Sequence, residues 1–351
     1  MTQGVLPDRE IAALIADGAL RVPDADDGQV QPASLDLRLG DVAYRVRASF
    51  LPGEARVADR LGEFEMHRFP LTDGAVLEKG CVYLVPLREA LSLPSDVSAV
   101  ANAKSSTGRL DLLTRTVADG GTEFDRVPAG YDGPLWAEIC PRSFSVLARA
   151  GMRLNQIRFR RGVAVLDDDA LRALHARTPL VDGDAVIDGG LSFSVDLARD
   201  GVVGWRAKPH SGVIHLDRLA HHRPGDFWEA IRAEDRRIVL DPGAFYILVS
   251  REAVTIPPDH AAEMAPYLPM VGEFRVHYAG FFDPGFGVGQ PARGVLEVRA
   301  HEAPFALEHG QAVGRLVYER MAGEPSTLYG AGIASNYQGQ GLKLSKHFAA
   351  P

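Results

Sequence analysis

A short polar segment, Lys104-Ser105-Ser106-Thr107-Gly108-Arg109, gathers hydroxyl, ammonium and guanidinium groups within a single turn's length of chain. At a turn, serine hydroxyls and backbone N–H groups can donate to phosphate oxygens. Lys104 adds a point charge, and Arg109 supplies a rigid fork of donors. The segment therefore favours a phosphate-bearing ligand, although a capped turn with a purely structural role would use the same residue types.

A carboxylate interrupts an apolar strand pattern at Leu135-Trp136-Ala137-Glu138-Ile139. Alternation along a strand places Glu138 on the same face as Trp136. Burial beside an aromatic ring would raise the pKa of the carboxyl group and let it accept and return a proton near neutral pH. The structural alternative is a strand glutamate that is paired with a surface arginine.

The same pattern occurs a second time at Gly294-Val295-Leu296-Glu297-Val298, so Glu297 is a rival to Glu138 for proton transfer. An aspartate precedes each of these strands, Asp125 within Phe124–Gly133 and Asp283 within the Asp-Pro-Gly turn of Phe282–Phe286. Each half of the chain therefore carries one aspartate and one glutamate in the same order.

These duplicated residues belong to an internal repeat. The stretch Leu77–Tyr83 and its continuation to Asp96 align without a gap onto Leu240–Tyr246 and the continuation to Asp259, at a constant offset of 163. Upstream, Ala33–Leu37 resembles Phe193–Leu197. A duplication explains this constant spacing better than chance does.

The elements that must carry these residues are short strands separated by turns. The predicted strands include Val82–Leu87, Leu135–Ile139, Ile157–Val165, Ala244–Val249 and Val295–Val298. Helical spacing is expected only at the edges of the repeats, in Asp8–Leu20 and Asp167–Ala176. The sequence predicts four parts, namely a first repeat at 1–165, a linker at 166–190, a second repeat at 191–325 and a tail at 326–351.

Composition narrows the class of protein. The formal net charge of -8 argues against a nucleic acid polymer as a partner. The sequence has no window of about 20 apolar residues that could form a membrane span. Two cysteines are too few for a disulfide framework, and the H-x-E and P-C-x-x-C signatures of zinc deaminases are absent from the sequence. A cytoplasmic protein is expected.

Together with the strand Gln31-Pro32-Ala33-Ser34-Leu35-Asp36-Leu37-Arg38-Leu39-Gly40, the Lys104–Arg109 and Leu135–Ile139 segments resemble the dCTP deaminase family. The resemblance implies a mainly β chain, built as two tandem dUTP pyrophosphatase-like β-clip (distorted β-barrel) repeats with a few short helices. It also implies homo-oligomers, conversion of dCTP to dUTP without zinc, and Mg²⁺ carried only by the nucleotide triphosphate.

The resemblance also assigns roles to individual residues. Glu138 or Glu297 would shuttle protons, while Ser105, Arg109 and the main chain near Ala118 would position the water. The substrate-binding residues implied by the family are Lys104, Ser106, Ala118, Asp125, Trp136, Asp283, Tyr329 and Gln340. Asn336 stands where the family has a lysine, a lost charge that Lys343 or Lys346 could offset.

The second repeat departs from the family because Tyr267–Gly272 aligns with the Ser-Ser-x-x-Arg segment and lacks its hydroxyls and guanidinium. Composite sites that draw different parts from each repeat are therefore a hypothesis. A dUTP pyrophosphatase using Asp125, Tyr131 or Asp283, a bifunctional enzyme that forms dUMP from dCTP, and a noncatalytic nucleotide-binding protein remain alternatives.

Overall fold

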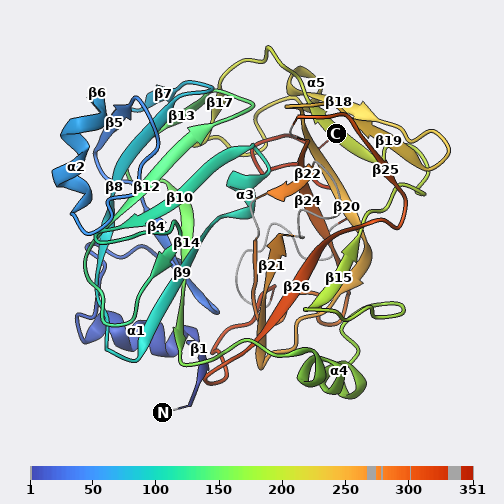
Figure 1. Ribbon diagram of the computed structural model, residues 1–351, viewed down its shortest axis with the longest axis horizontal. Helices are drawn as coiled ribbons and strands as arrows, with labels where there is room; N and C mark the ends of the chain where they lie inside the picture. The colour runs from blue at the N-terminus through green and yellow to red at the C-terminus, as the bar shows by residue number, and fades with distance from the viewer. Residues whose placement is uncertain (1, 267–273, 278–279, 301, 331–340, 351) are drawn as a thin grey trace.

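The computed structural model describes residues 2–266, 274–277, 280–300, 302–330 and 341–350. Strands dominate the described chain and its helices are short, which confirms the predicted mainly β class. Figure 1 shows the amino-terminal strands, from blue to green, on one side of the molecule and the carboxyl-terminal strands, from yellow to red, on the other. No helix in the described ranges is long and apolar enough to cross a membrane.

The first repeat is built on two larger sheets, ordered β11-β9-β14-β4-β3 and β10-β12-β8-β5-β6, with β1 beside β14 and β2 beside β8. Its strands are β1 (Gly4–Val5), β2 (Leu20–Arg21), β3 (Val30–Gln31), β4 (Ser34–Arg38), β5 (Val42–Val46), β6 (Glu65–Pro70), β7 (Ala75–Leu77), β8 (Val82–Ser92), β9 (Val97–Ala103), β10 (Leu112–Ala118), β11 (Arg126–Val127), β12 (Asp132–Pro141), β13 (Val146–Ala148) and β14 (Arg153–Arg161). The apolar run Leu135–Ile139 lies in β12, between β10 and β8, where both of its faces are buried.

The second repeat reproduces these strand orders as β23-β21-β26-β15 and β22-β24-β20-β16-β18. Its strands are β15 (Leu191–Ser194), β16 (Gly204–Ala207), β17 (Ile214–His215), β18 (Trp228–Ile231), β19 (Arg237–Leu240), β20 (Phe245–Val254), β21 (His260–Pro266), β22 (Phe274–His277), β23 (Phe281–Phe282), β24 (Ala292–Ala300), β25 (Phe305–Glu308) and β26 (Ala312–Arg320). The first residues of β8 and β9 lie 163 positions before those of β20 and β21. The tandem repeat is therefore confirmed.

The predicted strand Ile157–Val165 was too long at its carboxyl end. β14 stops at Arg161 because Gly162 takes a left-handed φ of 62°, which ends the extended backbone. The chain beyond this turn contacts the second repeat instead, since the Arg320 N–H donates to the Ala164 carbonyl at 2.8 Å.

Helices α1 (Asp8–Ala16) and α4 (Asp168–Arg177) occupy the two regions where helical spacing was expected. The expectation that helices occur only at the edges of the repeats was wrong. Inside them lie α2 (Val57–Phe64), α3 (Ser105–Gly108) and α5 (Pro224–Phe227). These helices are one or two turns long, too short for an apolar period to emerge from the sequence.

Charged side chains join the two repeats. Arg158 on β14 is fully buried and donates to Glu319 Oε2 at 3.1 Å and to the Ala262 carbonyl at 3.0 Å. Arg160 pairs with Glu263 at 2.8 Å. These arginines of β14 therefore supply cations to an interface whose anions come from the other repeat.

Apolar contacts cross the same boundary. The main core cluster of the first repeat includes Phe144, whose ring lies 5.2 Å from that of Trp228 in the second repeat. β13 also pairs in parallel with β17, with Val146 opposite Ile214. The repeats therefore share part of one core, and residues from both can meet at a fixed geometry.

Candidate active site

The Lys104–Arg109 segment forms the turn between β9 and β10 and contains α3. The Lys104 ammonium pairs with Asp36 of β4, and its backbone N–H donates to the Leu154 carbonyl at 2.9 Å. Ser106 and Arg109 are buried. The predicted phosphate-binding residues are thus held in one rigid turn against β4 and β14.

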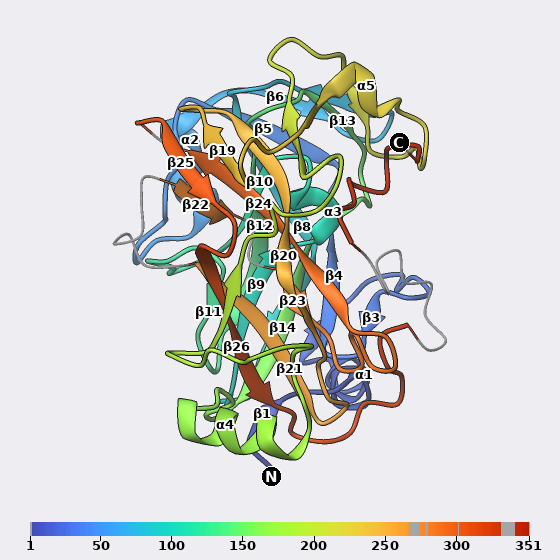
Figure 2. The same cartoon turned by 90° about the vertical axis from the view of Figure 1, so that its right-hand side faces the viewer.

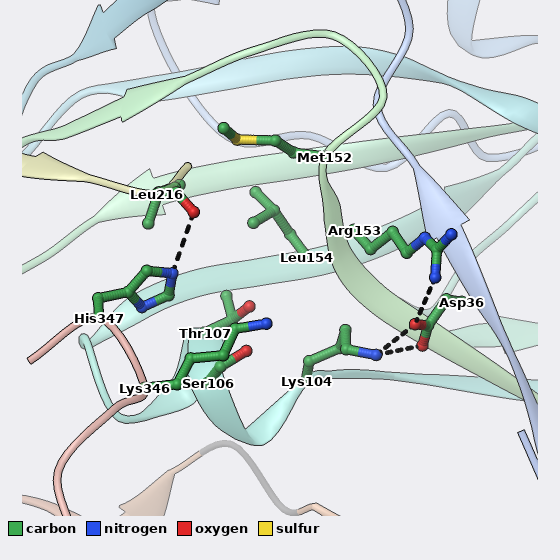
Figure 3. Close-up of a pocket in the computed structure, with 10 residues that line it drawn as sticks. All are labelled: Asp36, Lys104, Ser106, Thr107, Met152, Arg153, Leu154, Leu216, Lys346 and His347. Carbon is green, nitrogen blue, oxygen red and sulfur yellow. Dashed lines mark hydrogen bonds and ion pairs between the residues drawn. The ribbon is translucent and has the colours of Figure 1, made fainter. Parts of the chain in front are cut away.

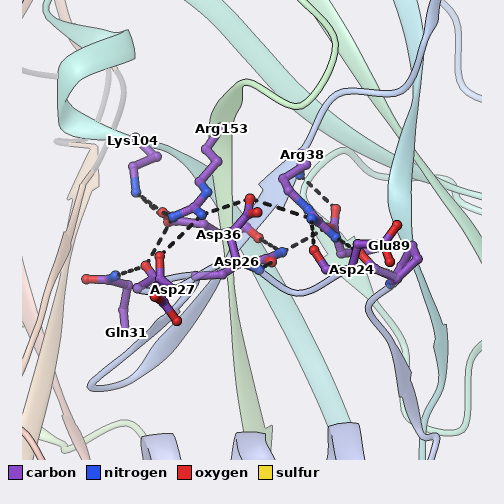
Figure 4. Close-up of polar contacts among 12 residues, drawn as sticks. Asp24, Asp26, Asp27, Gln31, Asp36, Arg38, Glu89, Lys104 and Arg153 are labelled. Carbon is purple, nitrogen blue, oxygen red and sulfur yellow. Dashed lines mark hydrogen bonds and ion pairs between the residues drawn. The ribbon is translucent and has the colours of Figure 1, made fainter. Parts of the chain in front are cut away.

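Asp36 belongs to a network of charged side chains around the strand segment that begins at Gln31 (Figure 4). Arg153 lies 3.8 Å from Asp36 and pairs with Asp26 at 3.0 Å. On the same strand, Arg38 pairs with the buried Glu89 at 2.7 Å. Every residue of β4 is buried, and its two charged side chains, Asp36 and Arg38, are in ion pairs.

Glu297 of β24 carries a buried carboxyl group. Burial raises its pKa well above the ordinary value, Arg109 opposes the shift, and Asp111 adds to it. Among the described residues, Glu297 forms no hydrogen bond or ion pair. A glutamate from one repeat and an arginine from the other are therefore close enough to interact electrostatically.

The main chain at Gly280 approaches the same turn. A Cβ atom built on Gly280 would lie 3.5 Å from Ser105 Oγ. Strand register makes Gly280 the counterpart of Ala118, because Arg115 pairs with Glu138 and His277 pairs with Glu297. The backbone position predicted at Ala118 thus has an equivalent in the second repeat that faces Ser105.

Asp283 is buried beside the same group of residues. Burial raises its pKa, while Arg158 at 3.2 Å and Lys104 oppose the shift and Asp36 contributes to it. Tyr329 braces the turn that follows, since its N–H donates to the Pro284 carbonyl at 2.8 Å and its ring lies 5.5 Å from Phe286. The predicted residue Gln340 lies outside the described residues.

The reciprocal set of residues surrounds Glu138 and has a different chemistry. Arg115 Nε donates to Glu138 Oε1 at 3.1 Å, and the Arg115 guanidinium lies 3.5 Å from the centroid of the Phe124 ring. Trp136 lies in the apolar cluster on this side of the sheet, which α2 covers. The aligned segment Tyr267–Gly272 lies outside the described residues.

Asp125 lies near this second group. Its Oδ1 accepts from the Thr116 N–H at 2.7 Å. Burial raises the pKa of Asp125 to about 7, the Thr116 hydrogen bond and Arg115 oppose the shift, and Glu263 and Glu138 add to it. The two aspartates predicted from the sequence thus both lie near residues of the opposite repeat.

A cavity of about 240 Å³ opens beside the Lys104–Arg109 segment (Figure 3). Lys346 and His347 reach it from the carboxyl-terminal segment, which runs beside α5 (Figure 2). Arg109 Nη1 also donates to the Lys343 carbonyl at 3.1 Å. Sequence reasoning did not identify Arg115, Arg158 or Gly280, whose importance depends on contacts with partners distant in sequence.

Within the described ranges, no group of three or more His, Cys, Asp and Glu side chains is arranged to hold a metal ion. The charged groups near Glu297 are the Arg109 guanidinium and the Asp111 carboxylate. The Ser105 hydroxyl lies close to the Gly280 main chain in the same part of the molecule. A guanidinium can bind an anionic ligand, and a buried carboxyl group can transfer protons to it.

Comparisons with known proteins agree with the two-repeat organisation. The family model for the N-terminal domain of 2′-deoxycytidine 5′-triphosphate deaminase matches residues 2–163, and the model for its C-terminal domain matches residues 167–348. A crystal structure of 2′-deoxycytidine 5′-triphosphate deaminase from Agrobacterium tumefaciens is 56% identical, with a TM-score of 0.88, and the match covers 92% of this chain and 100% of that chain.

Curated relatives match a smaller share of the chain. The dCTP deaminase of Halorubrum lacusprofundi is 31% identical over 160 residues, which cover 44% of this chain and 76% of that protein. A dUMP-forming dCTP deaminase of Streptomyces coelicolor is 33% identical over 172 residues, which cover 44% of this chain and 78% of that protein. Most of each relative therefore corresponds to less than half of this chain.

Proposed function

This chain belongs to the 2′-deoxycytidine 5′-triphosphate deaminase family and is a deaminase, and we propose that it converts dCTP to dUTP and ammonia at one composite site per chain. The first repeat contributes Lys104–Arg109. The second contributes Glu297, Gly280 and Asp283, with Tyr329 beside the Asp283 turn. The observation that carries this proposal is the buried Glu297 carboxyl group with Arg109 of the other repeat as its neighbouring cation.

The surroundings of Glu138 argue against it as the proton shuttle. Arg115 holds its carboxylate in an ion pair, as in the structural alternative considered from the sequence. To act as a proton shuttle, this carboxylate would have to give up its charged hydrogen bonds to the guanidinium. Glu297 has no such partner among the described residues, so its environment favours proton uptake.

The proposed chemistry follows from what deamination of cytosine needs. Glu297 takes a proton from water as the water oxygen adds to C4, and Glu297 passes this proton to N3. Glu297 then carries the proton of the new C4 hydroxyl to the amino group, so that the C4–N bond breaks, ammonia leaves and the C4 carbonyl of uracil forms. Ser105 and the Gly280 main chain would orient the water, and Arg109 would stabilise the negative charge that develops.

The phosphates and sugar would be bound by other parts of the same site. Lys104 and Ser106 offer a charge and a hydroxyl to phosphate oxygens, and Asp283 would accept from the deoxyribose hydroxyl. We propose that Mg²⁺ arrives with the triphosphate and that no zinc takes part. Activity should then survive treatment with a zinc chelator once Mg²⁺ is restored.

A second possible product is dUMP, because the Streptomyces coelicolor relative is named as dUMP-forming. If this chain shared that activity, it would release pyrophosphate as well as ammonia. Asp125 and Asp283 are the carboxylates that such a hydrolysis could use. Chromatography of the nucleotide product separates dUTP from dUMP directly.

The proposal is tested with wild type, Glu297→Gln and Glu138→Gln, each incubated with dCTP and Mg²⁺ while ammonia and nucleotide products are followed. Glu297→Gln should lower kcat by about 10²–10⁴-fold, the range for loss of a general acid-base group. Glu138→Gln should stay within about twofold of wild type at a temperature where it remains folded.

Calorimetric titration with dUTP adds an independent check and should give one nucleotide per chain. Loss of activity in Glu138→Gln with retention in Glu297→Gln would reverse the assignment of the two repeats. Pyrophosphate without ammonia would support a dUTP pyrophosphatase, and binding without turnover would support a noncatalytic nucleotide-binding protein.

The expected homo-oligomer stays a prediction. Because the proposed site takes its parts from both repeats of one chain, it does not need a neighbouring subunit for those residues. Light scattering coupled to gel filtration measures the state of assembly, and activity of a dilute monomer would separate assembly from catalysis.

A further inference from the structure

An ion pair that crosses between the repeats lies next to the proposed site. Asp111 follows α3, and its Oδ2 pairs with Nη2 of Arg299, which lies on β24 (Figure 1). The Asp111 side chain is fully buried, and that of Arg299 is 9% exposed. Ser143, after β12, donates from Oγ to Asp111 Oδ2 at 2.6 Å and accepts from Arg299 Nη2 at 3.2 Å. We call these three residues the clamp, because they join the two repeats through a buried network.

Further hydrogen bonds hold each side of the clamp in place. The Asp111 carbonyl accepts from the Arg142 N–H at 3.0 Å. Asp111 has a left-handed φ of 53°, a conformation that aspartate adopts more readily than most residues. In the second repeat, Arg299 Nη1 donates to the Gly243 carbonyl. The clamp therefore has a rigid attachment on each repeat.

The spacing of the charges places the clamp beside the site of proton transfer. Arg109 lies two residues before Asp111, and Glu297 lies two residues before Arg299 on the same face of β24. The first repeat therefore presents a cation and then an anion, and the second presents an anion and then a cation. Arg109 and Asp111 are also the groups whose charges act on the buried Glu297 carboxyl group. Fixing Asp111 against Arg299 consequently limits how far Arg109 can move from Glu297.

The equivalent position in the first repeat does not carry an arginine. Alignment of Glu138 with Glu297 places Cys140 where Arg299 lies, and Cys140 is a free, partly buried thiol. The arginine of the clamp thus accompanies the glutamate that is proposed to transfer protons and not its counterpart. This difference favours a role in the reaction over a general role in the fold of each repeat.

We propose that the clamp is a positioning device for deamination, in which Asp111, Ser143 and Arg299 hold the Arg109 guanidinium at a fixed distance from Glu297. The proposal rests on the proposed function, in which Glu297 transfers protons. The three residues act through Arg109 and Glu297 and not on the nucleotide, so they are positioning residues.

Substrate binding should depend little on the clamp. Lys104, at the start of the same turn, is held independently by its pair with Asp36 and by the 2.9 Å hydrogen bond from its N–H to the Leu154 carbonyl. Loss of the clamp should therefore displace Arg109 more than Lys104. Displacement of a catalytic group by about 1 Å can lower a rate by about 10²-fold. The expected consequence is a lower kcat with little change in KM.

Arg299→Met and Asp111→Asn test the clamp, with Arg299→Lys as the charge-retaining variant and Arg160→Met as the matched control. Asp111→Asn removes the charge, and asparagine also tolerates the left-handed backbone. Arg160 likewise pairs across the repeats, with Glu263 at 2.8 Å, but it lies on β14. The measurements are kcat and KM for dCTP, the calorimetric Kd for dUTP, and the thermal unfolding midpoint of every variant.

Arg299→Met should lower kcat about 10–100-fold, while the KM for dCTP and the Kd for dUTP stay within about threefold of wild type. Asp111→Asn should lower kcat by at least about fivefold, and it decides the test if Arg299→Met is unfolded at the assay temperature. Arg299→Lys should recover most of the lost kcat. Arg160→Met should lower the unfolding midpoint and leave kcat within about twofold of wild type.

A combined variant separates positioning from a general loss of structure. Because the clamp acts through Glu297, adding Arg299→Met to Glu297→Gln should lower kcat by less than about threefold beyond Glu297→Gln alone. An additional loss as large as the loss in the wild-type background would overturn the proposal. An equal loss of kcat in Arg160→Met would also overturn it, because any ion pair between the repeats would then have the same effect.

The same measurements distinguish failure of the clamp from failure of the proposed function. Full activity of Glu297→Gln, or no ammonia release by the wild type, would refute the proposed function and the clamp with it. An inactive Glu297→Gln together with unchanged kcat in Arg299→Met and Asp111→Asn would refute the clamp alone. A weaker affinity for dUTP with unchanged kcat would likewise refute it, because these residues would then serve substrate binding.

Discussion

Glu138 and Glu297 occupy equivalent strand positions but differ in whether an arginine binds the carboxylate. Glu138 is opposite Arg115, whose guanidinium binds it and rests on Phe124. Glu297 has His277 as its backbone partner in the same register. The Arg115 guanidinium thus makes Glu138 an ion-paired carboxylate, whereas Glu297 forms no ion pair among the described residues and is suited to proton transfer.

Asp125 provides a residue-level test based on pH. Its pKa is about 7 in the fold, above its ordinary value of 3.8, so the folded state holds a proton that the unfolded state has lost between these values. The contribution of Asp125 to stability is therefore fully present below pH 3.8 and is lost as pH rises through about 7. Asp125→Asn cannot titrate and keeps an oxygen for the Thr116 N–H.

The free energy of unfolding of Asp125→Asn, relative to wild type, should consequently increase by about 2–3 kcal/mol between pH 5 and pH 8, since one pKa unit is worth about 1.4 kcal/mol. Urea unfolding at the two pH values measures this difference. A constant difference across that range would show that Asp125 titrates normally.

At the scale of elements, turns decide how the strands that carry the site are placed. β24 holds Glu297, and the turn before it passes close to the end of β20. Gly287 in this turn has a φ of 73°, and a Cβ built on it would lie 2.1 Å from the Val254 carbonyl oxygen. Glycine is therefore needed here both for its backbone conformation and for the close approach.

Gly287→Ala and Gly289→Ala separate these two effects. Gly289 also has a left-handed φ, of 79°, but nothing lies within 4 Å of its built Cβ. Gly289→Ala should cost about 1 kcal/mol of stability from the backbone alone, and Gly287→Ala should cost at least about 1 kcal/mol more, because β20 and β24 must separate. Thermal unfolding compares the two variants, and equal losses would contradict the close approach.

At the scale of the whole molecule, the repeats are joined by buried charges as well as by apolar contacts. The side chains of Arg158 and Glu319 are 0% and 1% exposed, and Glu319 also pairs with Arg160 at 2.5 Å. Separating the halves would leave these charges without partners in each one. The interface that builds the composite site is therefore also needed for the stability of both repeats.

Glu319→Ala should reduce the free energy of unfolding by about 3 kcal/mol, because it removes the buried anion that Arg158 and Arg160 share and leaves them only their pairs with Asp283 and Glu263. The control is Asp169→Ala, which removes an exposed pair with Arg172 and should leave the unfolding midpoint nearly unchanged. Tryptophan fluorescence during urea unfolding reports on both repeats, through Trp136 in one and Trp228 in the other. Equal midpoints for the two variants would show that the buried pair is dispensable.

Local patterns in the sequence were sufficient for much of this structure. Strand alternation, the gapless offset between Leu77–Asp96 and Leu240–Asp259, and the turns at glycine predicted a mainly β chain of two repeats. The same patterns identified Lys104–Arg109 and both glutamates. Short helices such as α2 escaped detection because one or two turns carry too few apolar residues to define a period.

The tertiary structure alone decided which residues meet. Alternation fixes the face of a strand on which Glu138 or Glu297 lies, but it does not fix what covers that face. The cover comes from residues far away in sequence, Arg109 for Glu297 and the carboxyl-terminal Lys346 for the cavity. These residues come together when the two repeats bury their shared core and pair their charges. That packing depends on the whole chain.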